Sequence, residues 1–204
     1  MTAWITTPTL RGPTVTLRPL EQSDRDAVLA AGQDGQLHTL FFTIVPGPDD
    51  IDGYMAKVAR TVAAGEEQVF AVIRNGDGRL IGSTRYMRMR AEHRRVEIGT
   101  TFYAASCQRT GVNTEAKRLL LTHAFDVMQC VKVEFRTDRF NRASQRAIER
   151  LGAQRDGILR SDAIMADGRV RDTVCYSVLA HEWPGVRANL EFLATRGGAH
   201  ARSA

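Results

Sequence analysis

The chain has 204 residues, of which 43% are hydrophobic and 25% are charged, and its formal net charge is +5. These values suit one large globular domain and exclude a fibrous or disordered chain. No run of eighteen apolar residues is present and the N-terminus lacks a secretory pattern, so we expect a cytoplasmic protein with no membrane partner. The three scattered cysteines argue against a disulfide framework, and the five histidines lack ligand spacing, so no metal is expected.

Hydrophobic periodicity and turn signals divide the chain into alternating strands and helices. In chain order we predict a strand at 14–20, helices at 23–31 and 49–64, strands at 68–74, 79–89 and 95–103, a helix at 114–129, a strand at 131–137, a helix at 142–151, and strands at 157–165 and 170–179. Antiparallel strands followed by a β-α-β crossover predict a mixed, mostly antiparallel sheet with flanking helices, in the α/β (α+β) class. We expect a single domain over 1–204, with its core at about 12–182 and a loose tail at 195–204.

The stretch 107-CQRTGVNTEAK-117 lies where a predicted strand ends and a helix begins. The first N–H groups of a helix have no partner within it and, with the positive end of the helix dipole, form an anion site. Gly111 would let the backbone approach a phosphate, and Arg109 would add a charged fork. The side chains of Thr110 and Thr114 could donate hydroxyl groups. These residues alone fit an ordinary strand-to-helix turn equally well, and neither the P-loop nor the dinucleotide-binding glycine pattern is present.

The wider pattern resembles the GNAT superfamily of acyl-CoA N-acyltransferases. Residues 108–113 are similar to that family's acetyl-CoA pyrophosphate loop, Gln/Arg-x-x-Gly-x-Gly/Ala, and 141-NRASQRAIERLGA-153 is similar to its Asn-x-x-Ser segment. Glu97-Ile98-Gly99, Asp167-Gly168-Arg169, Asp172 and Tyr176 resemble the branch that includes the ribosomal-protein N-terminal acetyltransferases. The chain departs from the family at Asn113, where Gly or Ala is usual, and at Ala105, where proline is frequent. It also has Ile148 where a tyrosine often protonates the leaving thiolate.

The resemblance implies a GNAT-like fold with a splayed strand pair, and transfer of an acetyl group from the co-substrate acetyl-CoA to a primary amine by direct attack in a ternary complex. The amine would be a peptide or protein N-terminus or a small molecule, and a homodimer would be compatible with the family. The residues implied to bind the coenzyme are Phe102, Tyr103, Gln108, Arg109, Thr110, Gly111, Val112, Asn113, Thr114, Asn141 and Ser144.

Three side chains are candidates for catalysis: Glu97, Ser144 and Tyr176. Glu97 is the leading general base, because it lies on the strand that runs toward the loop, on the face opposite Val96 and Ile98. Ser144 could lie near the sulfur and Tyr176 could face the amine, while backbone N–H groups near residues 102–104 could stabilise the oxyanion. The alternatives are an exposed strand carboxylate paired with a nearby arginine for Glu97, a helix N-terminal cap for Ser144, and a residue of the core or rim for Tyr176.

The segment 37–48 and the hairpin 158–179 are expected to form the walls of the amine site. Two other functions stay open at this stage. A non-catalytic CoA-binding sensor or scaffold would explain the missing tyrosine at position 148. A nucleic-acid-binding protein is disfavoured, because the arginines are interspersed with acidic residues rather than gathered in one basic patch.

Overall fold

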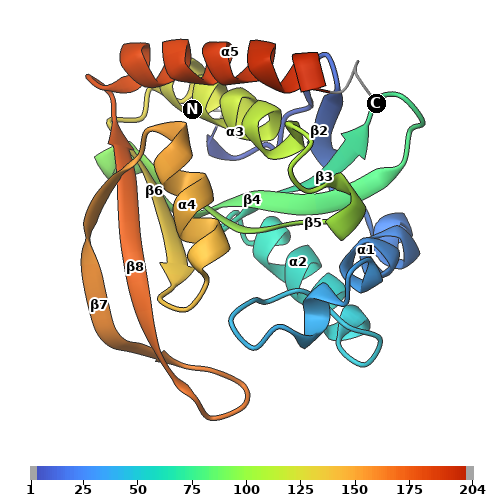
Figure 1. Cartoon of the computed structure of the whole chain (residues 1–204). Coiled ribbons are helices and arrows are strands. Elements are labelled where there is room, and N and C mark those ends of the chain that lie inside the picture. The colour runs from blue at the N-terminus through green and yellow to red at the C-terminus, as the bar shows by residue number, and fades with distance from the viewer. Residues whose placement is uncertain (1–3, 201–204) are drawn as a thin grey trace.

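A computed structural model describes residues 4–200 of the chain (Figure 1). Its eight-stranded sheet has the order β1-β2-β3-β4-β5-β6-β8-β7. The strands are β1 (Leu10–Arg11), β2 (Val15–Pro19), β3 (Gln68–Arg74), β4 (Leu80–Arg90), β5 (Arg95–Tyr103), β6 (Lys132–Asp138), β7 (Gln154–Ile164) and β8 (Val170–Leu179). Among these strands the neighbouring pair β5 and β6 is parallel and the other pairs are antiparallel, which confirms the predicted mixed sheet.

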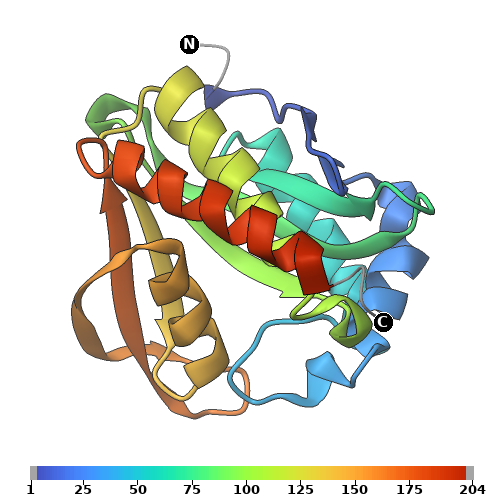
Figure 2. The same ribbon diagram turned by 45° about the horizontal axis from the view of Figure 1, so that its top comes forward.

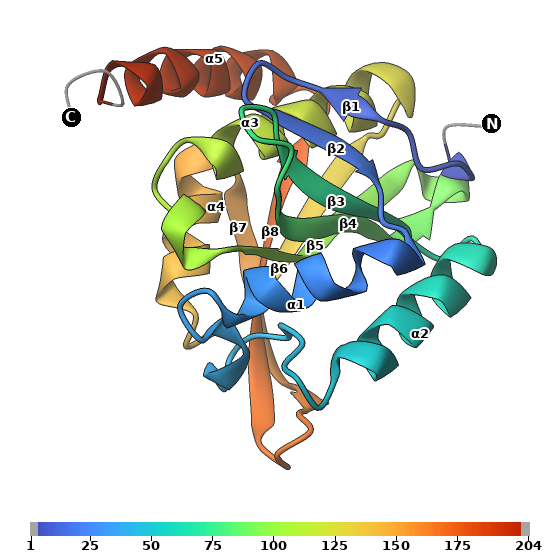
Figure 3. The same ribbon diagram turned by 90° about the vertical axis from the view of Figure 1, so that its right-hand side faces the viewer.

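Five α-helices flank the sheet on both sides (Figures 1 and 2). They are α1 (Arg25–Gln33), α2 (Ile51–Ala63), α3 (Val112–Thr122), α4 (Arg142–Leu151) and α5 (Trp183–His200). The helices α3, α4 and α5 lie on one face, where Tyr86 donates a hydrogen bond to the Leu120 carbonyl of α3. The helices α1 and α2 lie on the opposite face, against β3, β4 and β5 (Figure 3). The core therefore forms two apolar layers, one on each side of the sheet.

The helix predicted at 114–129 is divided in the structure. The α-helix α3 ends at Thr122, and residues His123–Val127 form a wider π-helical turn. A π-turn places one extra residue in each turn and so rotates the following side chains around the axis. A regular α-helix would place Val127 on the same face as the buried residues Leu120 and Ala124. In the structure Val127 is 57% exposed, and Met128 is buried instead.

The C-terminal helix α5 was not predicted. It packs along α3 (Figure 2), with Leu190 fully buried and the Trp183 indole donating to Asp126 on the π-turn. The helix continues to His200, so the tail predicted to be loose from residue 195 is helical as far as the structure describes it. Residues 201–204 lie outside the described part of the chain.

The parallel strands β5 and β6 separate after a short paired stretch. Their register runs from Arg95 opposite Lys132 to Glu97 opposite Glu134. Beyond Glu97, β5 continues to Tyr103 alongside β4, while β6 continues to Asp138 alongside β8 (Figure 1). A β-bulge at Thr100, whose φ is 44°, adds a residue to β5 and bends it away from β6. The expected splayed strand pair is thus confirmed, and the second half of β5 has one edge without a partner strand.

Candidate active site

The loop between β5 and α3 has two residues in the left-handed backbone region. Arg109 has a φ of 63°, and Gly111, the residue immediately before the helix, has a φ of 89°. The loop is held by two local hydrogen bonds, from Gln108 Nε2 to the Tyr103 carbonyl at 3.1 Å and from Thr110 Oγ1 to the Cys107 carbonyl at 2.6 Å. A β-carbon at Gly111 would meet no atom within 4 Å, so the backbone angle favours glycine here and the space in front of it is open.

The backbone N–H groups of residues 109–114 indicate which kind of ligand this loop can bind. Within the part of the chain that the structure describes, none of them has a hydrogen-bond acceptor in the protein, and Glu115 is the first residue whose N–H bonds back, to the Gly111 carbonyl. A row of free donors at the positive end of a helix dipole binds phosphate groups. These donors, the open space at Gly111 and the exposed Arg109 fit the diphosphate of a coenzyme A molecule.

The hydroxyl groups expected to donate to phosphate are already engaged within the protein. Thr110 donates to Cys107, as described above, and Thr114 is buried and accepts a hydrogen bond from Arg150 Nη2 of α4 at 2.8 Å. The neighbouring Glu115 is also buried and accepts from the backbone N–H of Thr14 at 2.9 Å. Thr114 and Glu115 therefore tie the start of α3 to α4 and to β2, and they hold the row of N–H groups in place.

Helix α4 places Asn141 and Ser144 at its N-terminus. The Asn141 side chain caps the helix, because its Oδ1 accepts from the Ser144 backbone N–H at 2.9 Å. The side chain of Ser144 is half-buried, one turn into the helix. Ile148, one further turn along, is buried in the core and offers no proton. The sequence predicted Ser144 as an alternative cap for this helix, whereas in the structure Asn141 is the capping residue.

Glu97 is the last residue of β5 that pairs with β6, and its side chain is 5% exposed. Its Oε2 lies 3.1 Å from Arg88 Nε and 3.4 Å from Arg136 Nε. Burial raises the pKa of the carboxyl group, and the two arginines partly oppose that rise. A β-carbon at Gly99 would lie 3.0 Å from Glu97 Oε1 and 2.6 Å from Met87 Sδ, so the glycine leaves room for the carboxylate. Glu97 is therefore a buried carboxylate, unlike the exposed strand residue of the alternative interpretation, although it does contact arginines.

Tyr176 lies on the other face of the sheet from Glu97. Glu97 is opposite Glu134, which is opposite Ser177, and successive residues of a strand point to opposite faces. The Tyr176 hydroxyl is buried against α4 and donates to Glu149 Oε1 at 2.8 Å. Burial, with help from the Glu149 carboxylate, raises the pKa of Tyr176 to about 12. The structure thus does not bring Tyr176 to Glu97, and the tyrosine contributes to the core.

The segment 37–48 and the hairpin of β7 and β8, both predicted to form walls of the amine site, contact each other through Arg169 and Phe41. Arg169 in the hairpin turn donates from Nη2 to the Phe41 carbonyl at 3.2 Å and to Asp138 Oδ2 at 2.7 Å. Its guanidinium group lies over the Phe41 ring, 5.1 Å from the ring centroid. These contacts join the segment 37–48 to the end of β6 at Asp138. Among the N–H groups expected to stabilise an oxyanion, that of Ala104 is occupied by the Ile81 carbonyl at 2.8 Å.

Two further features were not indicated by the sequence. Lys117 of α3 is buried under the bulge of β5, and its Nζ donates to Thr101 Oγ1 at 2.7 Å and to Thr84 Oγ1 at 3.2 Å. Burial lowers the pKa of Lys117 to about 7. The second feature is the polar face of β6, where Arg136 and Asp138 lie on the same face as Glu97. Charged residues alternate along β6, and this alternation is the one sequence signal from which the polar face could have been predicted.

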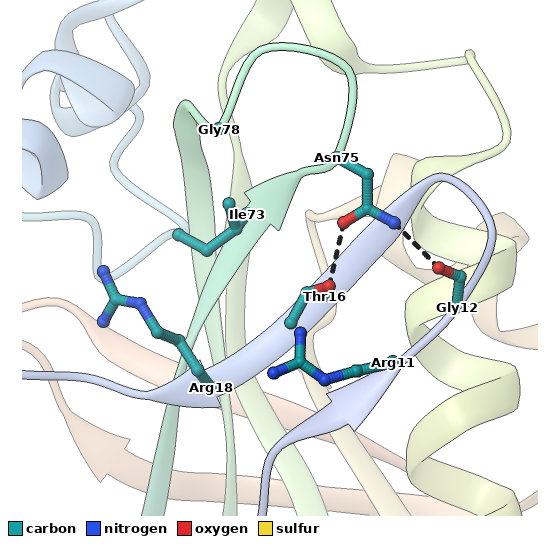
Figure 4. Close-up of a pocket in the computed structure, with 7 residues that line it drawn as sticks. All are labelled: Arg11, Gly12, Thr16, Arg18, Ile73, Asn75 and Gly78. Carbon is teal, nitrogen blue, oxygen red and sulfur yellow. Dashed lines mark hydrogen bonds between the residues drawn. The ribbon is translucent and has the colours of Figure 1, made fainter.

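A hollow in the surface lies apart from all these residues (Figure 4). It is formed by β1, β2 and β3, where Asn75 accepts from Thr16 Oγ1 at 2.8 Å and donates to the Gly12 carbonyl at 2.7 Å. The hollow therefore contains none of the residues that the sequence predicts for catalysis or coenzyme binding.

Residues 14–154 match the acetyltransferase (GNAT) domain. The chain belongs to the GNAT family. It is 32% identical over 109 residues to YdaF of Bacillus subtilis, a candidate ribosomal N-acetyltransferase by its name, in a match that spans 53% of this chain and 58% of YdaF. A GCN5-related N-acetyltransferase structure from Brucella melitensis has 29% identity and a TM-score of 0.81, covering 92% of this chain and 86% of that one.

The structure of Mycobacterium smegmatis RimJ in complex with CoA-disulfide has 22% identity and a TM-score of 0.74, covering 92% of this chain and 94% of RimJ, which shows a shared fold. As a GNAT protein, the chain is an acyl-CoA-dependent N-acetyltransferase, and it resembles the branch of ribosomal-protein acetyltransferases. Acetyl-CoA is the donor that this family uses. Among the residues described, no helix has the length and apolar character needed to cross a membrane.

Proposed function

We propose that acetyl transfer takes place where β5 separates from β6, with Glu97 as the general base. The observation that carries this proposal is that β5 loses its partner strand immediately after Glu97. One place therefore combines a free strand edge, the donor-rich start of α3 and a buried carboxylate with a raised pKa. When bound, acetyl-CoA supplies the activated acyl group as a thioester.

The donor half of the site consists mainly of backbone groups. The N–H groups of residues 109–114 would hold the diphosphate, with Arg109 beside it. The free edge of β5, with Phe102 and Tyr103, would pair with the amides of the pantetheine arm as an added strand does. The Asn141 side chain uses its oxygen to cap α4, which leaves its NH2 group to donate to the same arm.

The acceptor half depends on Glu97. An ammonium group has no lone pair, so Glu97 would take a proton from the amine before or during attack on the thioester carbon. The C–N bond then forms and the C–S bond breaks, while N–H groups of the free β5 edge stabilise the oxyanion. Ile148 supplies no acid, and the proposal assigns the proton for the leaving thiolate to Ser144 or to water.

The variant Glu97→Gln tests this assignment. With the base removed, turnover at neutral pH should fall at least about tenfold, since general-base catalysis contributes roughly 10²–10⁴-fold. The affinity for acetyl-CoA should stay within about twofold, because the coenzyme contacts are elsewhere. Glu134→Gln is the matched control, since Glu134 lies directly opposite on β6 and contacts Lys132 at 3.5 Å. Turnover is measured as free thiol released with a panel of amines, and a wild-type rate for Glu97→Gln would remove this residue from the mechanism.

A further inference from the structure

The acceptor side of the sheet carries an unusual concentration of arginine. On the face opposite α4, β6 presents Glu134, Arg136 and Asp138, each opposite a small residue of β8. The helices α1 and α2 pack against β3, β4 and β5 on this side, and the hairpin of β7 and β8 extends beyond them (Figure 3). Along β6 the side chains of Glu134 and Arg136 are partly exposed, at 13% and 21%, whereas the side chain of Asp138 is buried.

Positive charge exceeds negative charge around Glu97. Arg88 and Arg136 lie beside Glu97, and Arg169 and Arg171 lie beside Asp138 on the same face, so four guanidinium groups meet two carboxylates. The excess is two positive charges, four minus two. The neighbouring Lys132 lies 3.5 Å from Glu134 and 2.8 Å from Asp156, and this group of one cation and two carboxylates lowers the excess to one positive charge.

Several of these guanidinium groups have N–H donors without acceptors. Within the described residues, Nε and Nη1 of Arg169 are inaccessible to solvent and make no hydrogen bond. Nε of Arg136 and Nε of Arg171 also make no hydrogen bond, but they face carboxylate oxygens, at 3.4 Å from Glu97 Oε2 and 4.0 Å from Asp138 Oδ2. Buried donors are normally paired, so the two unpaired donors of Arg169 indicate missing acceptor oxygens. Asp138 is buried and holds Arg169 at 2.7 Å, with Arg171 Nε 4.0 Å away, so the arginines are held in position before any ligand arrives.

We propose that the acceptor is an amine that carries a carboxylate or phosphate group, and that Arg136, Arg169 and Arg171 bind this group. The inference rests on the proposed function, in which Glu97 receives the amine. Arg136 contacts Glu97 directly, and Arg169 donates hydrogen bonds to the Phe41 carbonyl and to Asp138. An amine at Glu97 thus places its neighbouring atoms among planar guanidinium groups, which suit the oxygens of carboxylates and phosphates. The same charges repel polyamines.

Matched pairs of acceptors test this proposal and identify the source of the negative charge. The small-molecule pairs are β-alanine with β-alaninamide, and 2-aminoethyl phosphate with ethanolamine. The peptide pair is Ala-Asp-Ala-amide with Ala-Asn-Ala-amide. We expect kcat/KM to be at least about tenfold higher for the charged member of at least one pair, and the pair that responds shows whether a small molecule or an acidic peptide supplies the charge.

Variants then link that preference to the arginines. Arg171→Gln should reduce the charged-to-neutral ratio of kcat/KM at least about threefold, and Arg171→Lys should give an intermediate ratio because it keeps the charge and loses the planar fork. Arg139→Gln is the control, since Arg139 is exposed and pairs with Asp172 at 3.2 Å, and it should leave the ratio unchanged. Melting curves confirm that each variant is folded, and if Arg171→Gln does not fold, the same ratio is read from Arg136→Gln.

The proposal is overturned if every pair gives a ratio of one or less, or if no charged amine is acetylated. Its failure is distinguishable from a failure of the proposed function. If the charged-to-neutral ratio of kcat/KM is near one and Glu97→Gln loses turnover, then Glu97 is the base and the anion site is absent. An enzyme with a high ratio whose Glu97→Gln variant is fully active has the anion site and a different base.

Discussion

The start of α3 and the charged face of β6 and β8 are both suited to anions, but they achieve this with different groups. At residues 109–114 the donors are backbone N–H groups, and their direction depends on left-handed residues such as Gly111. On β6 and β8 the donors are arginine side chains held by Asp138. Backbone donors are the same for any sequence that adopts the turn, whereas side-chain donors change with each substitution. A binding site for a constant coenzyme suits the first arrangement, and a site for a particular acceptor suits the second.

The largest effect on ligand binding that this comparison predicts is at the backbone donors of residues 109–114. Gly111→Val places a β-branched residue at a φ of 89°, where it is strained, and fills the open space in front of the N–H groups. Affinity for acetyl-CoA should fall at least about a hundredfold, which corresponds to roughly 2.7 kcal/mol. Isothermal calorimetry measures the affinity.

Gly78→Val is the matched control for Gly111→Val. Gly78 has a similar φ of 70° and equally open surroundings, but it lies in the turn between β3 and β4. Both variants should lose similar stability, and only Gly111→Val should lose coenzyme binding. Equal affinities for the two variants would contradict the assignment of the loop.

A smaller effect on ligand binding, together with a loss of folding stability, is expected at the side-chain site. Asp138→Ala leaves Arg169 without its buried partner, and breaking such a pair costs about 3–5 kcal/mol of the free energy of unfolding. The control Asp172→Ala breaks an exposed pair with Arg139 and should cost about 1 kcal/mol or less. Urea denaturation measures both. The KM for the acceptor should rise in Asp138→Ala while acetyl-CoA affinity stays constant, and a joint loss of both would mean that the two sites are not separate.

The last prediction concerns folding stability alone and Lys117 of α3, whose buried Nζ donates to Thr101 and Thr84. Its pKa is lowered to about 7 by burial, so between pH 7 and 10.5 the unfolded chain binds a proton that the folded chain does not. The free energy of unfolding of the wild type should therefore rise with pH in this window, relative to Lys117→Met, by at most roughly 1.4 kcal/mol per pH unit. Below pH 7 the difference should be constant. A difference that does not change between pH 7 and 10 would mean that Lys117 keeps its ordinary pKa.

The elements that follow from local pattern were predicted well. The strands at 68–74 and 95–103 and the helix at 142–151 have the predicted bounds, and Gly152 ends the last of them with a φ of 103°. Helix α5 was missed because Pro184, Gly185 and two further glycines disfavour a helix in isolation. Its burial against α3 outweighs that preference, while Pro184 is tolerated because it lies in the first turn.

By itself the sequence determined the mixed sheet, the strand-to-helix turn at residues 108–113 and the face of its strand on which Glu97 lies, opposite Val96 and Ile98. These features depend on residue order within short segments, such as alternation along strands or a glycine before a helix. The tertiary structure alone decided that Tyr176 faces α4 and that Lys117 is buried. It also gathered arginines from β4 and β6 beside Glu97, and one from the β7–β8 hairpin beside Asp138. These contacts join residues that are distant in sequence, so they depend on strand register and on which face each strand presents, and no local pattern contains that information.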